Sequence, residues 1–172
     1  MKRVSVVAGM LLILSGAVYA EDVPRTAKAT LRNAVGEELG KAVFIEESEG
    51  VKIVMNVHGF PQGPHGFHIH SIGKCDPPDF TSAGSHFNPY GKKHGLKNPD
   101  GAHAGDLQNL SIGIDGSATE EWIAKGVTLG PGENSLLKPE GTSLVIHVNP
   151  DDEKTDPAGN AGARIACGVI TQ

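Results

Sequence analysis

The sequence predicts an all-β protein built as an antiparallel β-sandwich or barrel. After residue 20 the chain has no long stretch with apolar residues at helical spacing, and short runs of strand-forming residues recur instead. Glycine and proline punctuate these runs, with 23 glycines and 11 prolines among 172 residues. Closely spaced short strands separated by turn residues are typical of sandwiches and barrels.

Seven segments are expected to form strands. They are Lys28–Arg32, Gly40–Glu46, Val51–His58, Gly66–His70, Leu110–Ile114, Ala118–Ile123 and Ser143–Val148. The third has the clearest alternation, because apolar residues occupy every second position from 51 to 57, as in a strand with one buried face. Asp115-Gly116 separates two of the runs and favours a tight hairpin turn.

Two longer segments interrupt this rhythm. Ser71–Leu107 is rich in glycine, proline, histidine and aspartate, and Asn149–Ala163 is a second stretch without a strand pattern. Long irregular loops inside a compact domain usually serve a function. We therefore expect the functional residues to lie in or beside these two loops.

Residues 1–20 are expected to be a secretory signal peptide. Lys2 and Arg3 supply a positive start, residues 6–18 are mostly apolar and uncharged, and Val18-Tyr19-Ala20 resembles a cleavage site. A buried N-terminal helix is the alternative. No later stretch approaches the roughly 20 apolar residues that a membrane span needs. The sequence predicts an exported protein with one domain over residues 21–172.

The expected mature chain is acidic. Residues 1–20 hold two of the 15 basic residues and none of the 20 acidic ones, so the remainder carries a net charge of −7. This charge argues against nucleic acid or an anionic membrane as a partner. The two cysteines, Cys75 and Cys167, are an even number in an exported chain, which favours a disulfide over two free buried thiols.

Two histidines alternate with apolar residues in the stretch Gly66–His70. Successive side chains of a strand point to opposite faces, so Phe67 and Ile69 are expected on one face, and His68 and His70 on the other. Two imidazoles on one face of a rigid strand suit a metal site. A half-buried strand with a polar outer face would show the same pattern.

A second series follows in the first long loop. His86, His94 and His103 are spaced along it and end in Asp106. Three histidines and one aspartate are a reasonable closed tetrahedral zinc set. His147 lies on the opposite face to its apolar neighbours in the segment Leu144–Val148, so His68, His70 and His147 together would make an all-nitrogen site that favours copper among the redox metals.

The chain resembles the secreted bacterial copper/zinc superoxide dismutases through six short stretches. They read GFHIH at 66–70, HFNP at 86–89, KHG at 93–95, HAGDL at 103–107, LVIHV at 144–148 and GNAGARIACGVI at 159–170. The resemblance implies a Greek-key antiparallel β-sandwich or barrel of about eight strands with two long functional loops. It also implies copper and zinc as cofactors, superoxide as the substrate and the periplasm as the location.

The resemblance implies two metal sites joined by one residue. The implied copper ligands are His68, His70, His86 and His147. The implied zinc ligands are His86, His94, His103 and Asp106. His86 would bridge both metals as an imidazolate, because zinc on one ring nitrogen acidifies the N–H of the other.

The resemblance also implies roles for residues around the metals. Asp151 would link the copper ligand His68 to the zinc ligand His94, with the neighbouring Asp152 as the competing assignment. Arg164 would bind the anion beside copper, and the pair Cys75 and Cys167 would tether it to the loop that follows His70. His65 resembles a structural histidine, His58 has no assigned role, and Lys154 is the one cation between residues 149 and 163.

The expected function is the disproportionation of superoxide to oxygen and hydrogen peroxide. The alternative is a periplasmic copper- and zinc-binding protein without a catalytic role, which would need neither Arg164 nor a bridging His86. A metal-free adhesion sandwich is a third class, since Trp122 lies between the two cysteines, but it leaves the histidine series unexplained. Both a monomer and a homodimer are compatible with the sequence.

Overall fold

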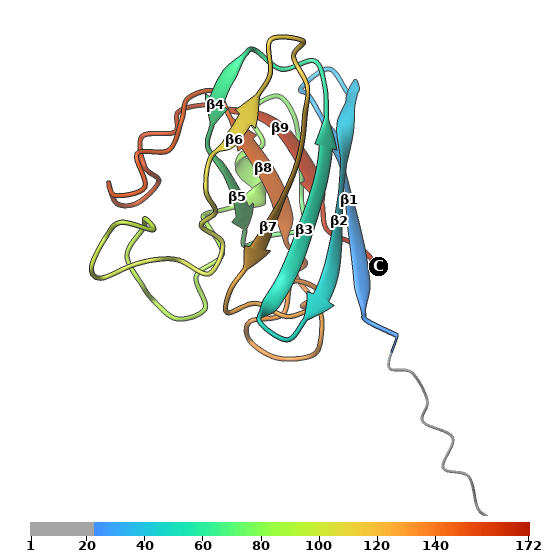
Figure 1. The fold of residues 1–172 in the computed structure, drawn as a ribbon. Coiled ribbons are helices and arrows are strands. Elements are labelled where there is room, and N and C mark those ends of the chain that lie inside the picture. The colour runs from blue at the N-terminus through green and yellow to red at the C-terminus, as the bar shows by residue number, and fades with distance from the viewer. Residues whose placement is uncertain (1–22) are drawn as a thin grey trace, which may run out of the picture.

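The computed structural model describes residues 23–172, which form nine strands and one short 3-10 helix (Figure 1). The strands are β1 (Thr26–Arg32), β2 (Glu38–Glu47), β3 (Gly50–Val57), β4 (Gly63–His65), β5 (Phe67–His70), β6 (Leu110–Ile112), β7 (Ala118–Ala124), β8 (Ser143–His147) and β9 (Arg164–Val169). The helix η1 spans Thr81–Ala83. The expected signal peptide, residues 1–20, lies outside the described residues. In the part of the chain that the structure describes, no helix has the length and apolar character needed to cross a membrane.

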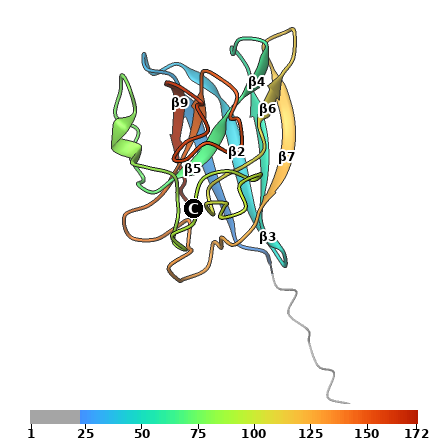
Figure 2. The same ribbon diagram turned by 90° about the vertical axis from the view of Figure 1, so that its left-hand side faces the viewer.

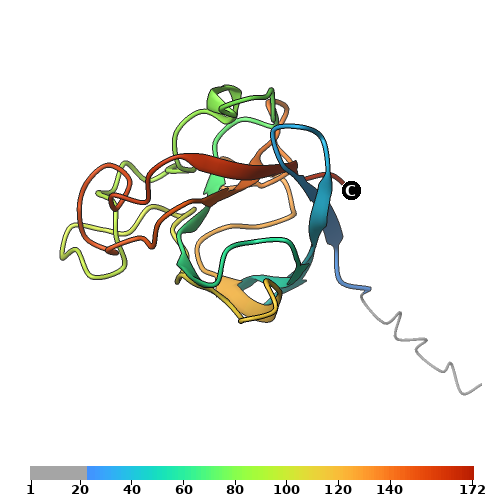
Figure 3. The same ribbon diagram turned by 90° about the horizontal axis from the view of Figure 1, so that it is seen from above.

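The all-β expectation is confirmed. Seven strands form one antiparallel sheet in the order β5-β8-β9-β1-β2-β3-β7, so the chain crosses between strands that are not neighbours in sequence. The strands curl around a central core when the molecule is seen from above (Figure 3). A small second sheet of β4 and β6 lies beside β7 (Figure 2) and connects directly to β5.

The seven expected strand segments all contain strand, but two strands were not anticipated. β4 is only three residues long, and its residues show no strand pattern in the sequence. β9 has the sequence RIACGV, in which alanine and glycine weaken the alternation that marks a strand. Its position between β8 and β1 buries Ala166, Cys167 and Gly168, so the sheet and not the local pattern makes this segment a strand.

The core confirms the alternation expected for β3. Val51, Ile53, Met55 and Val57 are each at most 1% exposed, and they pack with apolar side chains from the other strands. Along β5, by contrast, all four residues are buried, including both histidines. The second face of β5 does not meet solvent, because the two long loops cover it.

The two long loops lie next to each other on the same side of the sheet, where the second projects beside the first (Figures 1 and 3). The Lys97 amide donates to the Glu153 carbonyl oxygen at 2.9 Å, which joins one loop to the other. Gly95 approaches the Glu153 carbonyl so closely that an added Cβ would clash with it, and its φ of +109° also requires glycine.

The expected disulfide is confirmed. Cys75 and Cys167 are bonded, with 5.6 Å between their Cα atoms and a sequence separation of 92. Cys167 lies in the middle of β9, and Cys75 lies in the loop that follows β5. The bond therefore attaches the first long loop to the strand that begins with Arg164.

Candidate metal centre

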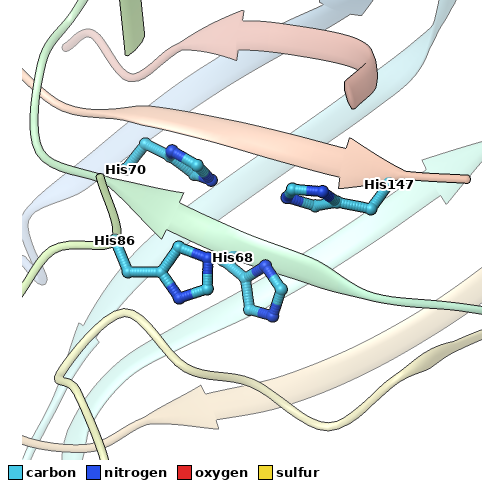
Figure 4. A group of neighbouring side chains, drawn as sticks. All are labelled: His68, His70, His86 and His147. Atoms are coloured by element: carbon cyan, nitrogen blue, oxygen red, sulfur yellow. The ribbon is translucent and has the colours of Figure 1, made fainter. Parts of the chain in front are cut away.

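Four histidines from three parts of the chain meet beside β5. His68 and His70 project from β5, His147 ends the neighbouring strand β8, and His86 comes from the first long loop. The rings of His70 and His147 turn toward each other, and His86 and His68 lie beside them (Figure 4). One ring nitrogen from each lies within 4.8 Å of the corresponding nitrogens of the other three.

Backbone hydrogen bonds explain how the loop brings His86 to this point. β5 is an edge strand, and residues 86–87 run beside its free edge: the Phe87 amide donates to the Ile69 carbonyl at 2.8 Å. The Ile69 amide in turn donates to the Gly105 carbonyl at 2.9 Å. A Cβ at Gly105 would collide with the Ile69 carbonyl oxygen, so the close approach of the loop depends on this glycine.

Each of these four rings is held through one nitrogen, while its other nitrogen has no hydrogen-bond partner. The held atoms and their acceptors are His68 Nε2 to Asp151 Oδ2 at 2.7 Å, His70 Nδ1 to the Gly84 carbonyl at 2.9 Å, His86 Nδ1 to Asp106 Oδ1 at 2.9 Å and His147 Nδ1 to the Gly162 carbonyl at 3.0 Å. The unpartnered atoms are His68 Nδ1, His70 Nε2, His86 Nε2 and His147 Nε2.

This pattern is chemically informative, because a buried polar atom without a partner is costly. In a neutral imidazole, a ring nitrogen that donates to a carbonyl or carboxylate leaves the opposite nitrogen as an unprotonated acceptor. Four such lone pairs that converge in the protein interior make an all-nitrogen donor set, which fits copper.

A second cluster adjoins the first. Nδ1 of His94 lies 3.1 Å from Asp106 Oδ1, and Nδ1 of His103 lies 3.3 Å from the same oxygen. One atom from each of His86, His94, His103 and Asp106 lies within 4.8 Å of the others. Three imidazole nitrogens and one carboxylate oxygen fit the closed tetrahedral coordination that zinc adopts.

Asp106 is oriented by backbone groups of its own loop. Its Oδ2 accepts hydrogen bonds from the Gly95 amide at 2.9 Å and from the His103 amide at 3.0 Å, which turns Oδ1 toward the histidines. Burial alone would raise the pKa of Asp106, but hydrogen bonds from the surrounding histidines lower it well below its usual range. The carboxylate is therefore charged at neutral pH and suited to a cation.

His86 belongs to both clusters through opposite atoms. Its Nδ1 faces Asp106, and its unpartnered Nε2 faces the group of His68, His70 and His147. The ring of His86 also stacks on that of His68, with 3.9 Å between centroids. A single imidazole thus stands between the two donor sets.

Asp151 connects the two clusters a second time. Its Oδ2 accepts from His68 Nε2 at 2.7 Å, and its Oδ1 accepts from His94 Nε2 at 3.0 Å. The competing residue, Asp152, lies elsewhere: its Oδ1 accepts from the amides of Lys154 and Thr155 inside the second loop.

Asn109 holds the backbone of Asp151, a role that the sequence does not indicate. Its side-chain Nδ2 donates to the Asp151 carbonyl at 2.9 Å, and its Oδ1 accepts from the Asp151 amide at 2.7 Å. A lone asparagine outside the long loops carries no signal in the sequence that would point to this contact. Gly159 completes the enclosure, since a Cβ there would overlap the Asp151 carboxylate.

The protonation behaviour of the rings differs between the clusters. Burial lowers the pKa of His68 to about 3 and that of His147 to about 4, so both rings are neutral and able to bind a metal at neutral pH. Burial also acts to lower the pKa of His94, but hydrogen bonds to Asp106 and Asp151 outweigh it and raise the pKa to about 9. Surroundings that stabilise a positive charge on this ring also favour a bound cation.

Arg164 lies at the start of β9, next to the first cluster. Its Nη1 donates to the Phe80 carbonyl and its Nη2 to the Gly84 carbonyl, both at 2.6 Å. The side chain is only half-buried, and burial lowers its pKa. Gly84, which carries this acceptor, has a φ of +77°, a left-handed conformation that favours glycine.

The remaining histidines lie outside the two donor sets. His65 is buried, with Nδ1 2.8 Å from the His147 carbonyl and Nε2 3.0 Å from the Pro61 carbonyl, as expected for a structural residue. His58 is exposed. Lys154 is also exposed.

A curled antiparallel sheet with two adjoining donor sets that share His86, one all-nitrogen and one of three nitrogens and an oxygen, has the features of a metal-binding β-protein with two neighbouring sites. The family model for copper/zinc superoxide dismutase matches residues 38–170. The chain belongs to the copper/zinc superoxide dismutase family.

Two curated relatives extend over nearly the whole chain. Superoxide dismutase [Cu-Zn] 2 of Aquifex aeolicus is 53% identical, over 99% of this chain and 99% of that protein. Superoxide dismutase [Cu-Zn] of Caulobacter vibrioides is 39% identical over the same shares.

Solved structures share the fold. The Cu/Zn superoxide dismutase from Brucella abortus matches with a TM-score of 0.70 and 31% identity, over 85% of this chain and 99% of that one. A SOD-like protein from Bacillus subtilis matches with a TM-score of 0.80 and 39% identity, over 83% and 96% of the two chains.

Proposed function

We propose that the two clusters are the copper and zinc sites of a superoxide dismutase. The proposed copper ligands are His68, His70, His86 and His147, and the proposed zinc ligands are His86, His94, His103 and Asp106. The observation that carries this assignment is the ring of His86, whose Nδ1 faces one donor set while its unpartnered Nε2 faces the other. The reaction is the disproportionation of superoxide to oxygen and hydrogen peroxide.

The bound copper ion would supply the electron transfer that oxidises one superoxide and reduces the next. The protein's own contribution begins with orientation: carbonyl or carboxylate acceptors hold one nitrogen of His68, His70 and His147, so that the other faces the donor set. Nε2 of His86 can take up a proton while Nδ1 remains beside Asp106. His86 is therefore suited to hold a proton that the reduction of superoxide consumes.

Arg164 is proposed to bind the anionic substrate. Two of its N–H groups are used by the Phe80 and Gly84 carbonyls, which leaves other donors of the guanidinium free. No carboxylate lies within ion-pair distance of this guanidinium among the described residues. A fixed positive charge beside the copper ligands can attract superoxide at short range, although the expected mature chain is acidic.

The alternative, a metal-binding protein without catalysis, is not favoured. Storage needs ligands but no arginine held beside them. Here the Gly84 carbonyl bonds both His70 Nδ1 and Arg164 Nη2, which ties the arginine to a proposed ligand. This shared acceptor supports a catalytic role for Arg164.

We also propose that residues 1–20 direct export to the periplasm and that residues 21–172 form the mature enzyme. The order of charge, apolar run and cleavage site in the sequence supports export, and the Cys75–Cys167 disulfide suits an oxidising compartment. N-terminal sequencing of protein recovered from a periplasmic extract tests the cleavage site. Analytical ultracentrifugation distinguishes the monomer from the homodimer.

The proposed function is tested by metal analysis together with superoxide dismutation by the metal-loaded protein. For the wild type we expect one copper and one zinc per chain. For His86→Ala we expect loss of activity and a changed content of both metals. A protein that holds both metals but does not dismutate superoxide would contradict the proposal and favour the storage alternative.

A further inference from the structure

Asp156, in the second long loop, reaches across to the first. Its Oδ1 accepts a hydrogen bond from the backbone amide of His94 at 2.8 Å. Its Oδ2 lies 3.0 Å from Lys93 Nζ. One carboxylate thus holds the backbone and the side chain of two consecutive residues of the other loop.

The second loop holds His94 at two separate places. Asp151 bonds the far side of its ring at Nε2, and Asp156 bonds its backbone amide. The remaining ring nitrogen, Nδ1, faces Asp106 in the proposed zinc set. The amide of His103, by comparison, bonds to Asp106 within the first loop itself.

The direction of a side chain depends on where the backbone places its Cα and Cβ. If only its ring nitrogens are bonded, the residue can still change its ring orientation through movement of its backbone. An additional hydrogen bond at the amide restricts that movement. The carboxylate of Asp156 is a charged acceptor, which makes a stronger hydrogen bond than a neutral one. Groups that orient a ligand in this way commonly change metal affinity by about 10–100-fold when they are removed.

We infer that Asp156 is a positioning residue for the zinc site, which acts through the His94 amide to hold the His94 ring in its ligating orientation and to slow zinc release. This inference rests on the proposed role of His94 as a zinc ligand. It also gives a reason for an acidic residue in a loop near an anion-binding arginine. Lys93 balances the negative charge of Asp156, and the carboxylate serves to hold the proposed zinc ligand His94.

The same loop offers a matched control in Asp152. It is also an exposed aspartate, and its side chain bonds only to residues of its own loop: the Lys154 amide at 2.9 Å, the Thr155 amide at 2.8 Å and Asn160 Nδ2 at 2.9 Å. Removing either carboxylate changes the net charge equally. Only the removal of Asp156 eliminates the bond to the His94 amide, together with the ion pair to Lys93.

The experiment measures zinc release from the copper- and zinc-loaded full protein into excess chelator, and zinc affinity by competition. We expect Asp156→Ala to release zinc about tenfold faster than wild type, and Asp152→Ala to stay within about twofold. Asp156→Asn retains Oδ1 as an acceptor and should stay within about threefold. Lys93→Ala retains the bond to the His94 amide and should behave like Asp156→Asn.

A spectroscopic readout separates ligand orientation from general loosening. With cobalt(II) in the zinc site, the d–d absorption bands should shift in Asp156→Ala and remain unchanged in Asp152→Ala. Equal zinc release from Asp156→Ala and Asp152→Ala would overturn the inference. Release from Asp156→Asn as fast as from Asp156→Ala would also overturn it, because charge and not the hydrogen bond would then be responsible.

His94→Ala distinguishes this inference from the proposed function. If His94→Ala leaves zinc release unchanged, the proposed zinc set is wrong, and the inference about Asp156 fails with it. If His94→Ala abolishes tight zinc binding but Asp156→Ala matches Asp152→Ala, the inference alone fails. Unfolding of the metal-free variants shows whether each one is folded before zinc is added.

Discussion

His70 and Arg164 share one hydrogen-bond acceptor, the carbonyl oxygen of Gly84, at 2.9 Å from His70 Nδ1 and 2.6 Å from Arg164 Nη2. A proposed copper ligand and the proposed substrate-binding cation are thereby fixed relative to each other by a single backbone group. The loop that carries Gly84 is attached to the strand of Arg164 by the Cys75–Cys167 disulfide. The positive charge is held at a set place beside the copper ligands.

Reversing the charge of Arg164 should reduce substrate capture. We expect Arg164→Glu to lower kcat/KM for superoxide by at least about tenfold, because the short-range attraction becomes repulsion. Arg164→Lys should retain part of the activity, since it keeps the charge but loses the guanidinium fork that spans the Phe80 and Gly84 carbonyls. Stopped-flow kinetics, with copper and zinc measured in each variant, checks both expectations. A fully metal-loaded Arg164→Glu protein with the wild-type rate would exclude this role.

The rate should also respond to salt. If the local charge beside copper controls capture, kcat/KM of the wild type falls as ionic strength rises, because screening shortens the attraction. The same assay across a range of salt concentrations tests this, with Arg164→Lys as the charge-matched control. A rate that rises with salt would show instead that the acidic surface of the whole chain governs approach.

Removing His147 should separate the two metals. We expect His147→Ala to weaken copper binding and abolish dismutation while zinc remains bound, because the ring of His147 faces only the first cluster. Metal analysis after dialysis, together with the activity assay, provides the measurement. Equal loss of both metals would show that the ligands have been divided wrongly between the sites.

Selective removal of zinc should loosen the first long loop. All four proposed zinc ligands lie within Ser71–Leu107. Of these, His86 also faces the copper set. Chelation of zinc with copper retained is expected to raise hydrogen exchange across this loop and to lower Tm, with part of the activity kept. Exchange in β3 serves as the internal control, since that strand lies in the core. Equal protection of the loop with and without zinc would contradict this prediction.

The metal-free protein should be most stable near pH 6.5. The folded-state pKa of His94, about 9, lies above its unfolded value of about 6.5, so its contribution is complete below 6.5 and is lost as pH rises through 9. For His68 and His147, the folded-state pKa values of about 3 and about 4 lie below 6.5, so stability falls as pH drops from 6.5 toward those values. Urea unfolding across this pH range measures the profile.

His94→Gln is the control for the alkaline side of that profile. It removes the titrating group, so the loss of stability between pH 6.5 and 9 should become smaller. A metal-free wild type whose free energy of unfolding rises steadily from pH 6.5 to 9 would contradict the assignment.

Much of the fold could be predicted from the sequence, because strand formation leaves a local signal. The alternation of residues 51–57 matches the buried face of β3, and the alternation around His68 and His70 predicts that both belong to one group of ring nitrogens, as they do. β9 gave no such signal, since alanine and glycine occupy its centre and its neighbours in the sheet determine its conformation.

The sequence by itself determined which residues could bind metals and which segments carry them, because the types and spacing of the ligands are local properties. The tertiary structure decided which of two adjacent aspartates lies between His68 and His94: Asp151 does so, and Asp152 faces its own loop. It also decided the contacts of Asn109 and Asp156, which join residues 42 and 62 positions apart in sequence. Such contacts depend on how two loops pack over one strand, and this packing cannot be predicted from the spacing of residues along the chain.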